Sequence, residues 1–281
     1  MKQLHKHTQA TLSHDLSAGP TRIVCLTEET TETLYLLEED WRIAGISGFT
    51  VRPPQARRQK PKVSAFTSAK IDRILALEPD LVLGFSDLQA DIAAQLIRAG
   101  LEVHVFNQRT VSGIFRMIQR LGSMVNASHK TQQLLGELRA GLDAIAQSAA
   151  NLPRRPRIYF EEWNSPLVSG IGRVSELITL AGGDDCFQQL ANSPDAISRI
   201  IADPEEVIRR EPDIIIGSWC GRRFNPGQVC ERPGWDCIPA VRDRQVHEIK
   251  SCDILQPGPA ALTDGVTQIH ALIKQWADLR C

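Results

Sequence analysis

The sequence has few aromatic residues and no long apolar run. Only 5 % of its 281 residues are aromatic, and two of these are tyrosines. No stretch reaches about 18 apolar residues, so the sequence predicts no transmembrane segment. Near the N-terminus, polar and histidine residues interrupt every apolar run, whereas a secretory signal needs an apolar core of ~7–15 residues. We therefore expect a cytoplasmic protein; a misassigned start or missing leader is the alternative, and would make it periplasmic.

Motifs of common catalytic and metal sites are also missing. There is no Walker sequence, no GxSxG and no HExxH. The seven cysteines form no CxxC pair of the kind zinc sites usually show. Their odd number and scattered positions favour a reducing compartment over a disulfide framework. The sequence thus predicts no catalytic residue, no catalytic cofactor and no metal site, and a protein that is not an enzyme.

The net charge and the length of the chain limit the possible binding partners and the number of domains. The formal net charge is −1, which offers no electrostatic basis for binding nucleic acid or an anionic membrane. Hydrophobic residues make up 42 % of the chain, enough for a full core. The length suits one large or two smaller domains.

One long helix is predicted over residues 126–151. Apolar residues recur there at three- and four-residue steps, which places them on one face. Asn126 and Ser128 are both suitable N-cap residues. Leu152 and Pro153 end the helix, because proline cannot continue it. The helix separates two stretches of similar pattern.

Those two stretches are residues 71–86 and 205–218. Each reads as a short helix, a Glu-Pro-Asp turn, an aliphatic strand and a glycine. Chance similarity between two such units is the alternative, since helix–turn–strand units are common. The matched order on both sides of the long helix favours a two-lobed design.

Alternation of strands and helices predicts an α/β fold. We expect two Rossmann-like lobes with parallel sheets, joined by one backbone helix, with a ligand cleft between the lobes. The predicted division is a flexible arm (1–20), an N-terminal lobe (21–125), a linking helix (126–152) and a C-terminal lobe (153–281). Expected strands are 22–26, 41–46, 81–83, 103–106, 158–160, 214–216 and 246–249, with residues 51–63 and 218–236 as irregular loops.

Five aromatic side chains follow or lie near predicted strands. In open parallel sheets, ligands bind beyond the carboxyl ends of the strands. Each ring alone could equally pack beneath its own loop. Together they favour an aromatic-lined site between the lobes, made of Phe49, Phe66, Phe85, Trp163 and Trp219.

Two carboxylates occupy matching positions in the repeated units. Asp72 and Glu205 both lie near the start of the helix that precedes the Glu-Pro-Asp turn. Either one alone is ordinary compensation of the helix dipole. As a pair they predict a docking surface for arginines on a two-fold symmetric partner.

The last third of the chain also contains Cys220, His247 and Cys252. Their spacing does not match a usual zinc site. They nevertheless support an alternative function, in which a cytoplasmic protein handles a metal or tetrapyrrole through this segment.

Several of these motifs also carry a family resemblance. The chain resembles the periplasmic binding proteins of the cobalamin, haem and ferric-siderophore importers, and most closely the cobalamin-binding branch. The resemblance spans about residue 22 to the C-terminus. It rests on residues 47–56 (SGFTVRPPQA), 63–66 (VSAF), 71–74 (IDRI), 78–82 (EPDLV), 169–170, 181–183 and 204–207.

The resemblance implies two α/β lobes bridged by a rigid helix, with aromatic rings from both lobes packing on a corrin. Phe49, Phe66 and Phe85 match the family's ligand positions, and Asp72 and Glu205 match its docking carboxylates for the permease of an ABC importer. Asp72 is shorter than the usual glutamate. The cysteine-bearing segment 219–252 and the lack of a visible leader depart from the family and point to an intracellular relative.

The sequence therefore predicts a non-enzymatic binding protein for a cobalamin-like corrinoid or a siderophore-like metal chelate.

Overall fold

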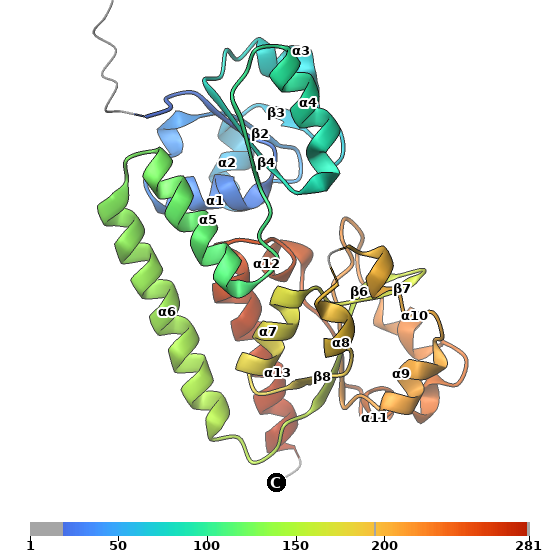
Figure 1. Cartoon of the computed structure of the whole chain (residues 1–281). Coiled ribbons are helices and arrows are strands. Elements are labelled where there is room, and N and C mark those ends of the chain that lie inside the picture. Colours follow the sequence, from blue (N-terminus) through green and yellow to red (C-terminus); the bar gives the residue numbers. More distant parts are fainter. Residues whose placement is uncertain (1–18, 194, 280–281) are drawn as a thin grey trace, which may run out of the picture.

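The computed structural model describes residues 19–193 and 195–279. It contains two α/β lobes, one above the other in Figure 1, with α5 (Val111–Met124) and α6 (Ser128–Ala150) along one side. The predicted two-lobed α/β fold is confirmed. The flexible arm predicted for residues 1–20 lies almost entirely outside the described residues.

The N-terminal lobe is built on a parallel sheet with strand order β3-β2-β1-β4-β5. Every strand is followed by a helix or turn on the sheet's C-terminal edge. The strands are β1 (Ile23–Cys25), β2 (Ile43–Ser47), β3 (Lys62–Ser64), β4 (Leu81–Phe85) and β5 (Val103–Phe106). The helices are α1 (Glu28–Leu36), α2 (Pro54–Gln59), α3 (Ile71–Leu75) and α4 (Ala90–Arg98).

The C-terminal lobe has the strand order β10-β9-β6-β7, and β8 pairs with the start of β6. Its strands are β6 (Arg157–Asn164), β7 (Leu167–Ser169), β8 (Asp184–Asp185), β9 (Ile214–Gly217) and β10 (Val246–Glu248). Its helices are α7 (Gly172–Leu180), α8 (Gln188–Ala191), α9 (Glu205–Arg210), α10 (Pro226–Cys230), α11 (Pro239–Arg242), α12 (Ser251–Ile254) and α13 (Val266–Asp278).

Several local predictions were wrong. Residues 218–236 are not one irregular loop, because Pro226–Cys230 form α10. The strand expected over 41–46 begins only at Ile43, after a 3-10 turn at Asp40–Arg42.

Residues 51–63 are not one loop, because Pro54 starts α2 and β3 follows. The second sheet is not wholly parallel, because β7 folds back antiparallel onto β6. Neither Asn126 nor Ser128 caps α6: Ala127 is its N-cap, and Asn126 turns the chain with a φ of 56°.

The core follows the two-residue period of the strands. Ile23 and Cys25 point to the same side of their sheet as α5 and α6, whereas Val24 packs into a separate cluster on the other side. The apolar face of α6 joins the inner clusters of both lobes into one continuous core.

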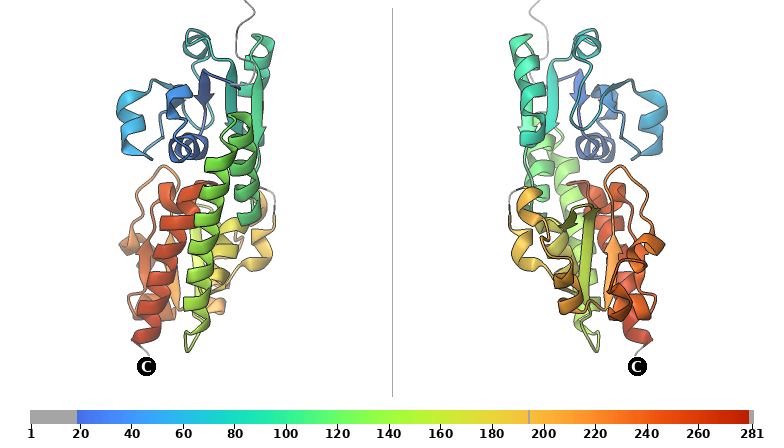
Figure 2. Two further views of the ribbon diagram at one scale, coloured as in Figure 1. Left: turned by 90° about the vertical axis from the view of Figure 1, so that its left-hand side faces the viewer. Right: turned by 90° about the vertical axis from the view of Figure 1, so that its right-hand side faces the viewer.

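Helix α6 contacts α5, α7 and α13, and Figure 2 shows α6 beside α13. The two lobes therefore share packed side chains and are not joined by a flexible tether.

Candidate ligand-binding site

The carboxyl ends of the N-terminal strands face the C-terminal lobe. Helix α1 follows β1, and the backbone N–H of Ala260 donates to Glu32 Oε2 over 3.1 Å. After β5, Gln108 Nε2 donates to the carbonyl of Pro257 over 3.0 Å. These contacts define an interlobe face: the surfaces that the two lobes turn toward each other at their strand ends. This is where ligands bind in open α/β sheets.

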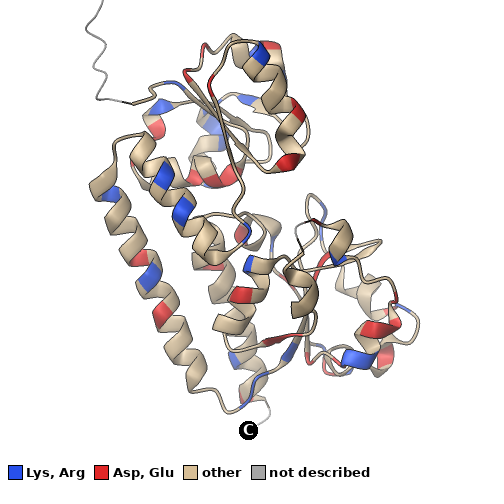
Figure 3. Ribbon diagram, viewed as in Figure 1, with Lys and Arg blue, Asp and Glu red and all other residues tan. Residues whose placement is uncertain are grey.

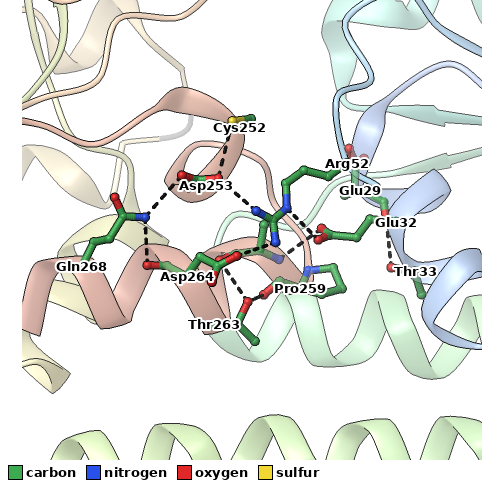
Figure 4. Close-up of polar contacts among 11 residues, drawn as sticks. Glu29, Glu32, Thr33, Arg52, Cys252, Asp253, Pro259, Thr263, Asp264 and Gln268 are labelled. Atoms are coloured by element: carbon green, nitrogen blue, oxygen red, sulfur yellow. Dashed lines mark hydrogen bonds and ion pairs between the residues drawn. The ribbon is translucent and has the colours of Figure 1, made fainter. Parts of the chain in front are cut away.

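Arg52, in the loop after β2, ties the two lobes together (Figure 4). Its Nε lies 2.9 Å from Glu32 Oε1 in its own lobe. Its Nη1 lies 3.1 Å from Asp253 Oδ1, and its Nη2 lies 2.5 Å from Asp264 Oδ2, both in the C-terminal lobe. A guanidinium with three carboxylate partners fixes their relative positions, because its donors form a rigid planar fork.

The three predicted phenylalanines lie at the carboxyl ends of three strands of one parallel sheet, β2, β3 and β4, with β1 between β2 and β4. Phe49 follows β2 and is 51 % exposed, Phe66 follows β3 and is half-buried, and Phe85 ends β4 with 9 % exposed. The buried side chain of Gln89 connects the last two: its Nε2 donates to Phe66 O over 2.9 Å, and its Oε1 accepts from Phe85 N over 2.9 Å. The structure thus brings these three residues to the same edge of the sheet.

The two predicted tryptophans behave differently from each other. Trp163 lies near the end of β6 and is half-buried, and its indole N–H donates to Ser165 O over 3.0 Å. Trp219 is only 2 % exposed. Its indole N–H donates to Glu161 Oε1 over 3.0 Å, and its ring packs edge-on against Phe224. Trp219 therefore belongs to the core of the C-terminal lobe in this conformation, and it does not join the other rings.

Sequence reasoning missed the partner that holds Trp219 in place. Glu161, near the middle of β6, is fully buried. Arg232 binds both of its carboxylate oxygens, with Nη1 at 2.5 Å and Nη2 at 2.8 Å, and Tyr159 OH lies 3.1 Å away. A glutamate placed directly after a strand of large apolar and aromatic residues, Ile158–Phe160, was the available signal for a buried charge that needs partners.

A second missed feature is the acidic start of α1. Glu28, Glu29 and Glu32 are 7 %, 1 % and 8 % exposed, and acidic residues gather there, toward the other lobe (Figure 3). Burial raises the pKa of Glu28 to about 8 and that of Glu29 to about 7, and it also raises the pKa of Glu32. Compensation of the helix dipole does not require the carboxylates to be buried. Because Glu32 accepts from the backbone of the other lobe, we assign this acidic turn to the interlobe face.

Arg173, in the first turn of α7, approaches from the other lobe. It is 5 % exposed, and burial lowers its pKa to about 10. Its charge interacts with that of Glu29. Buried groups of opposite sign therefore come from opposite lobes and meet near the base of the interlobe face.

The two predicted docking residues lie on different lobes, in equivalent positions. Asp72 is in the first turn of α3, and Glu205 is in the first turn of α9. Both are exposed, and the nearest cation to Glu205 is Arg209, with Nη1 at 3.7 Å from Oε2. They are thus accessible to a partner.

The predicted metal-handling residues are not gathered into one site. Cys220 is exposed after β9, His247 in β10 contacts Gln245, and Cys252 in α12 contacts Asp253. Across residues 19–193 and 195–279, no group of three or more His, Cys, Asp or Glu side chains is arranged to hold a metal ion. The alternative function therefore lacks the cluster on which it depends.

Known proteins share both the sequence pattern and the fold. A vitamin B12-binding protein of Vibrio campbellii is 26 % identical over 256 residues, which cover 89 % of each chain. The crystal structure of the periplasmic vitamin B12-binding protein BtuF of Vibrio cholerae has a TM-score of 0.73 and 21 % identity, covering 92 % of this chain and 98 % of that one. The apo periplasmic haem-binding protein RhuT of Roseiflexus sp. RS-1 has a TM-score of 0.76 and 20 % identity, covering 91 % and 100 %.

The family model described as periplasmic binding protein matches residues 23–252. This match overturns the expectation of a cytoplasmic protein, because members of the family work outside the cytoplasm and both solved structures named above are of periplasmic proteins. None of the helices within the described residues is long and apolar enough to span a bilayer. The family consists of binding proteins and not of enzymes. The chain belongs to the periplasmic binding protein family.

Proposed function

We propose that the protein binds a cobalamin-like corrinoid, or a related large metal chelate, between its two lobes and catalyses no reaction on it. The observation that carries this proposal is the exposed Phe49, with Phe66 and Phe85 at the same carboxyl edge of the sheet, the edge that contacts the C-terminal lobe. The vitamin B12-binding relatives support a corrinoid in particular.

Apolar contact with these rings supplies the affinity. Large exposed apolar groups are costly in water, and Val51 and Leu88, which follow β2 and β4, are also 39 % and 56 % exposed. If a planar ligand removes about 200 Å² of apolar surface from water, the gain is roughly 5 kcal/mol at ~25 cal/mol per Å². Trp163 would add a contact from the other lobe.

The lobes need little rearrangement to bind. Their cores are continuous through α6, and Arg52 links them by ion pairs. A preorganised site loses little free energy to ordering on binding. Contact with Trp219 would require movement of the residues around it, so we assign that residue a supporting role behind the site.

Delivery to the permease of an ABC importer would use Asp72 and Glu205. One exposed carboxylate on each lobe matches a partner with two symmetry-related arginine clusters. The shorter side chain of Asp72 would require a closer approach on that lobe. This docking role is independent of the ligand contacts, because both residues lie outside the interlobe face.

Calorimetric titration with cyanocobalamin, followed in parallel by tryptophan fluorescence, tests the proposal. We expect saturable binding with one ligand per protein, and about tenfold weaker binding for Phe66→Ala and for Trp163→Ala, since each loses one buried aromatic contact.

The matched control is Trp41→Ala. Trp41 is 60 % exposed and precedes β2, so it lies at the opposite end of that strand from Phe49. Its removal should leave the affinity unchanged. Absence of saturable binding to cyanocobalamin would refute the corrinoid proposal, while equal losses in all three variants would place the ligand elsewhere.

A further inference from the structure

Glu28, Glu29 and Arg173 form a buried polar floor at the interlobe face. The two glutamates begin α1 in one lobe, and the arginine begins α7 in the other. All three are less than one-tenth exposed. The segment Leu255–Gly258 contacts both the arginine and one of the glutamates. Arg173 Nη2 donates to Leu255 O. Gly258 packs so closely against Glu29 that a Cβ added at the glycine would lie 2.5 Å from the Cβ of Glu29. Glu29 and Arg173 therefore border the same short stretch of backbone, and Glu28 lies nearby, since its charge and that of Arg173 both act on Cys220.

Each of the three side chains has polar atoms without a hydrogen-bond partner among residues 19–193 and 195–279. Glu28 Oε2 and Glu29 Oε2 accept no hydrogen bond, and Arg173 Nε and Nη1 donate none. The remaining oxygen of Glu29 accepts from Thr27 Oγ1 over 2.7 Å, so its orientation is fixed. Buried polar atoms are nearly always paired in folded proteins, and leaving one unpaired is costly. Unpaired acceptors from one lobe and unpaired donors from the other indicate a ligand group that offers both.

The pKa values of these three groups are shifted in the directions that buried, incompletely paired charges produce. Burial raises the pKa of both glutamates because too few donors surround their carboxylates, and it lowers the pKa of Arg173 because too few acceptors surround its guanidinium. Once the pH is high enough to ionise both glutamates, a ligand carboxylate would serve Arg173 but place a third negative charge beside them. A ligand ammonium would serve the glutamates but oppose Arg173.

We propose that this floor recognises a neutral primary carboxamide on the rim of the ligand, with its N–H groups donating to Glu28 and Glu29 and its oxygen accepting from Arg173. The inference rests on the proposed function and narrows it. Corrinoids carry carboxamide arms around the ring, whereas porphyrins carry carboxylates. The floor would thus select an amide-bearing corrinoid over a carboxylate-bearing tetrapyrrole of similar size.

Two corrinoids with the same ring test this selectivity. Dicyanocobinamide carries carboxamides, and dicyanocobyrinic acid carries carboxylates in their place. At about pH 8.5, where both glutamates are largely ionised, we expect wild-type protein to bind dicyanocobinamide at least about tenfold more tightly.

The variant Glu28→Gln/Glu29→Gln keeps the shape of the floor and removes its negative charge. We expect it to bind dicyanocobyrinic acid about tenfold more tightly than wild type does, while its affinity for dicyanocobinamide changes by less than about threefold. A gain in affinity cannot come from misfolding. Arg173→Met should instead weaken dicyanocobinamide binding about tenfold, and Glu137→Gln, on the exposed side of α6, should change neither affinity.

The outcomes separate the two proposals. If wild-type protein binds both corrinoids equally, or if the double variant keeps the wild-type ratio, the carboxamide floor is refuted while corrinoid binding stands. If wild-type protein binds neither corrinoid, the proposed function itself fails and the floor fails with it.

Discussion

Two aromatic residues that follow strands, one in each lobe, lie in opposite environments. In the N-terminal lobe, Phe49 follows β2 and stays half exposed. In the C-terminal lobe, Trp219 follows β9 and is buried, because Glu161 accepts its indole N–H and Phe224 covers its ring. The position of an aromatic residue after a strand therefore does not decide its exposure. For Trp219, the buried acceptor Glu161 and the covering ring of Phe224 account for the burial.

The two lobes also present buried groups of opposite charge at the interlobe face. The N-terminal lobe presents buried glutamates at the start of α1, and the C-terminal lobe presents Arg173. Arg52 is the exception, since it reaches from the N-terminal lobe to Asp253 and Asp264. Complementary charge across the interlobe face both holds the lobes in place and sets the polarity of the proposed site.

The largest expected effect comes from Trp219→Ala. Removing a buried tryptophan should lower the free energy of unfolding by about 3–5 kcal/mol. Phe49→Ala should change it by less than about 0.5 kcal/mol, because the ring is half exposed and contributes to binding instead. Urea denaturation of the two variants measures both values. Equal losses of stability would remove the distinction between the lobes.

An effect of comparable size should appear as a dependence on pH. The folded protein keeps protons on Glu28 and Glu29 up to about pH 8 and 7, whereas the unfolded chain releases them near the ordinary value of 4.5. The free energy of unfolding contributed by these groups is therefore complete below about pH 4.5 and is lost as the pH rises to about 8. We expect a loss of several kcal/mol over this window, since each pKa unit corresponds to about 1.4 kcal/mol.

Thermal unfolding of wild type and of Glu28→Gln/Glu29→Gln at several pH values checks this. The variant should show the flatter profile, because its amides do not titrate. Arg57, Arg173 and Glu32 also act on these two acids, so the comparison is the difference between the two proteins and not the wild-type slope alone. Parallel profiles would contradict the prediction.

Arg52→Ala should have a more moderate effect. It removes the ion pairs that Arg52 makes with Glu32, Asp253 and Asp264. The side chains of Glu32 and Asp253 are largely buried, and that of Asp264 is exposed. We expect a loss of about 1–2 kcal/mol, reduced from that of a fully buried pair because Arg52 is itself 30 % exposed. Small-angle scattering should also show a wider distribution of lobe orientations. Unchanged scattering would mean that α6 alone holds the lobes.

The smallest effect on the isolated protein is expected for Asp72→Lys/Glu205→Lys. Both residues are exposed, so stability should change by less than about 0.5 kcal/mol and ligand affinity should not change. Stimulation of a reconstituted ABC importer by the liganded protein should be lost, since like charges would face each other. Full stimulation by the double variant would rule out the docking role.

Much of the architecture could be predicted from the sequence, because it depends on local periodicity. The stripe of leucines in α6 and the aliphatic strands Leu81–Phe85 and Ile214–Gly217 are visible without a structure. The antiparallel β7 was not, because pairing direction depends on contacts between distant residues.

The candidate site could be predicted only in its N-terminal half. Phe49, Phe66 and Phe85 lie at the carboxyl ends of three parallel strands of one sheet, so the parallel direction of the strands brings them to the same edge. The burial of Trp219 depends on Glu161, and the polar floor depends on how α1 of one lobe meets α7 of the other. Neither the burial of Trp219 nor the polar floor can be predicted from the sequence of one segment alone.

Hydrogen–deuterium exchange with and without saturating cyanocobalamin tests the central claim most directly. Binding between the lobes predicts slower exchange in both lobes together: at residues 47–52, 64–68 and 85–89 on one side and at residues 162–165 on the other. Slower exchange confined to one lobe, or centred on the outer surface between α7 and α8, would contradict a ligand site between the lobes.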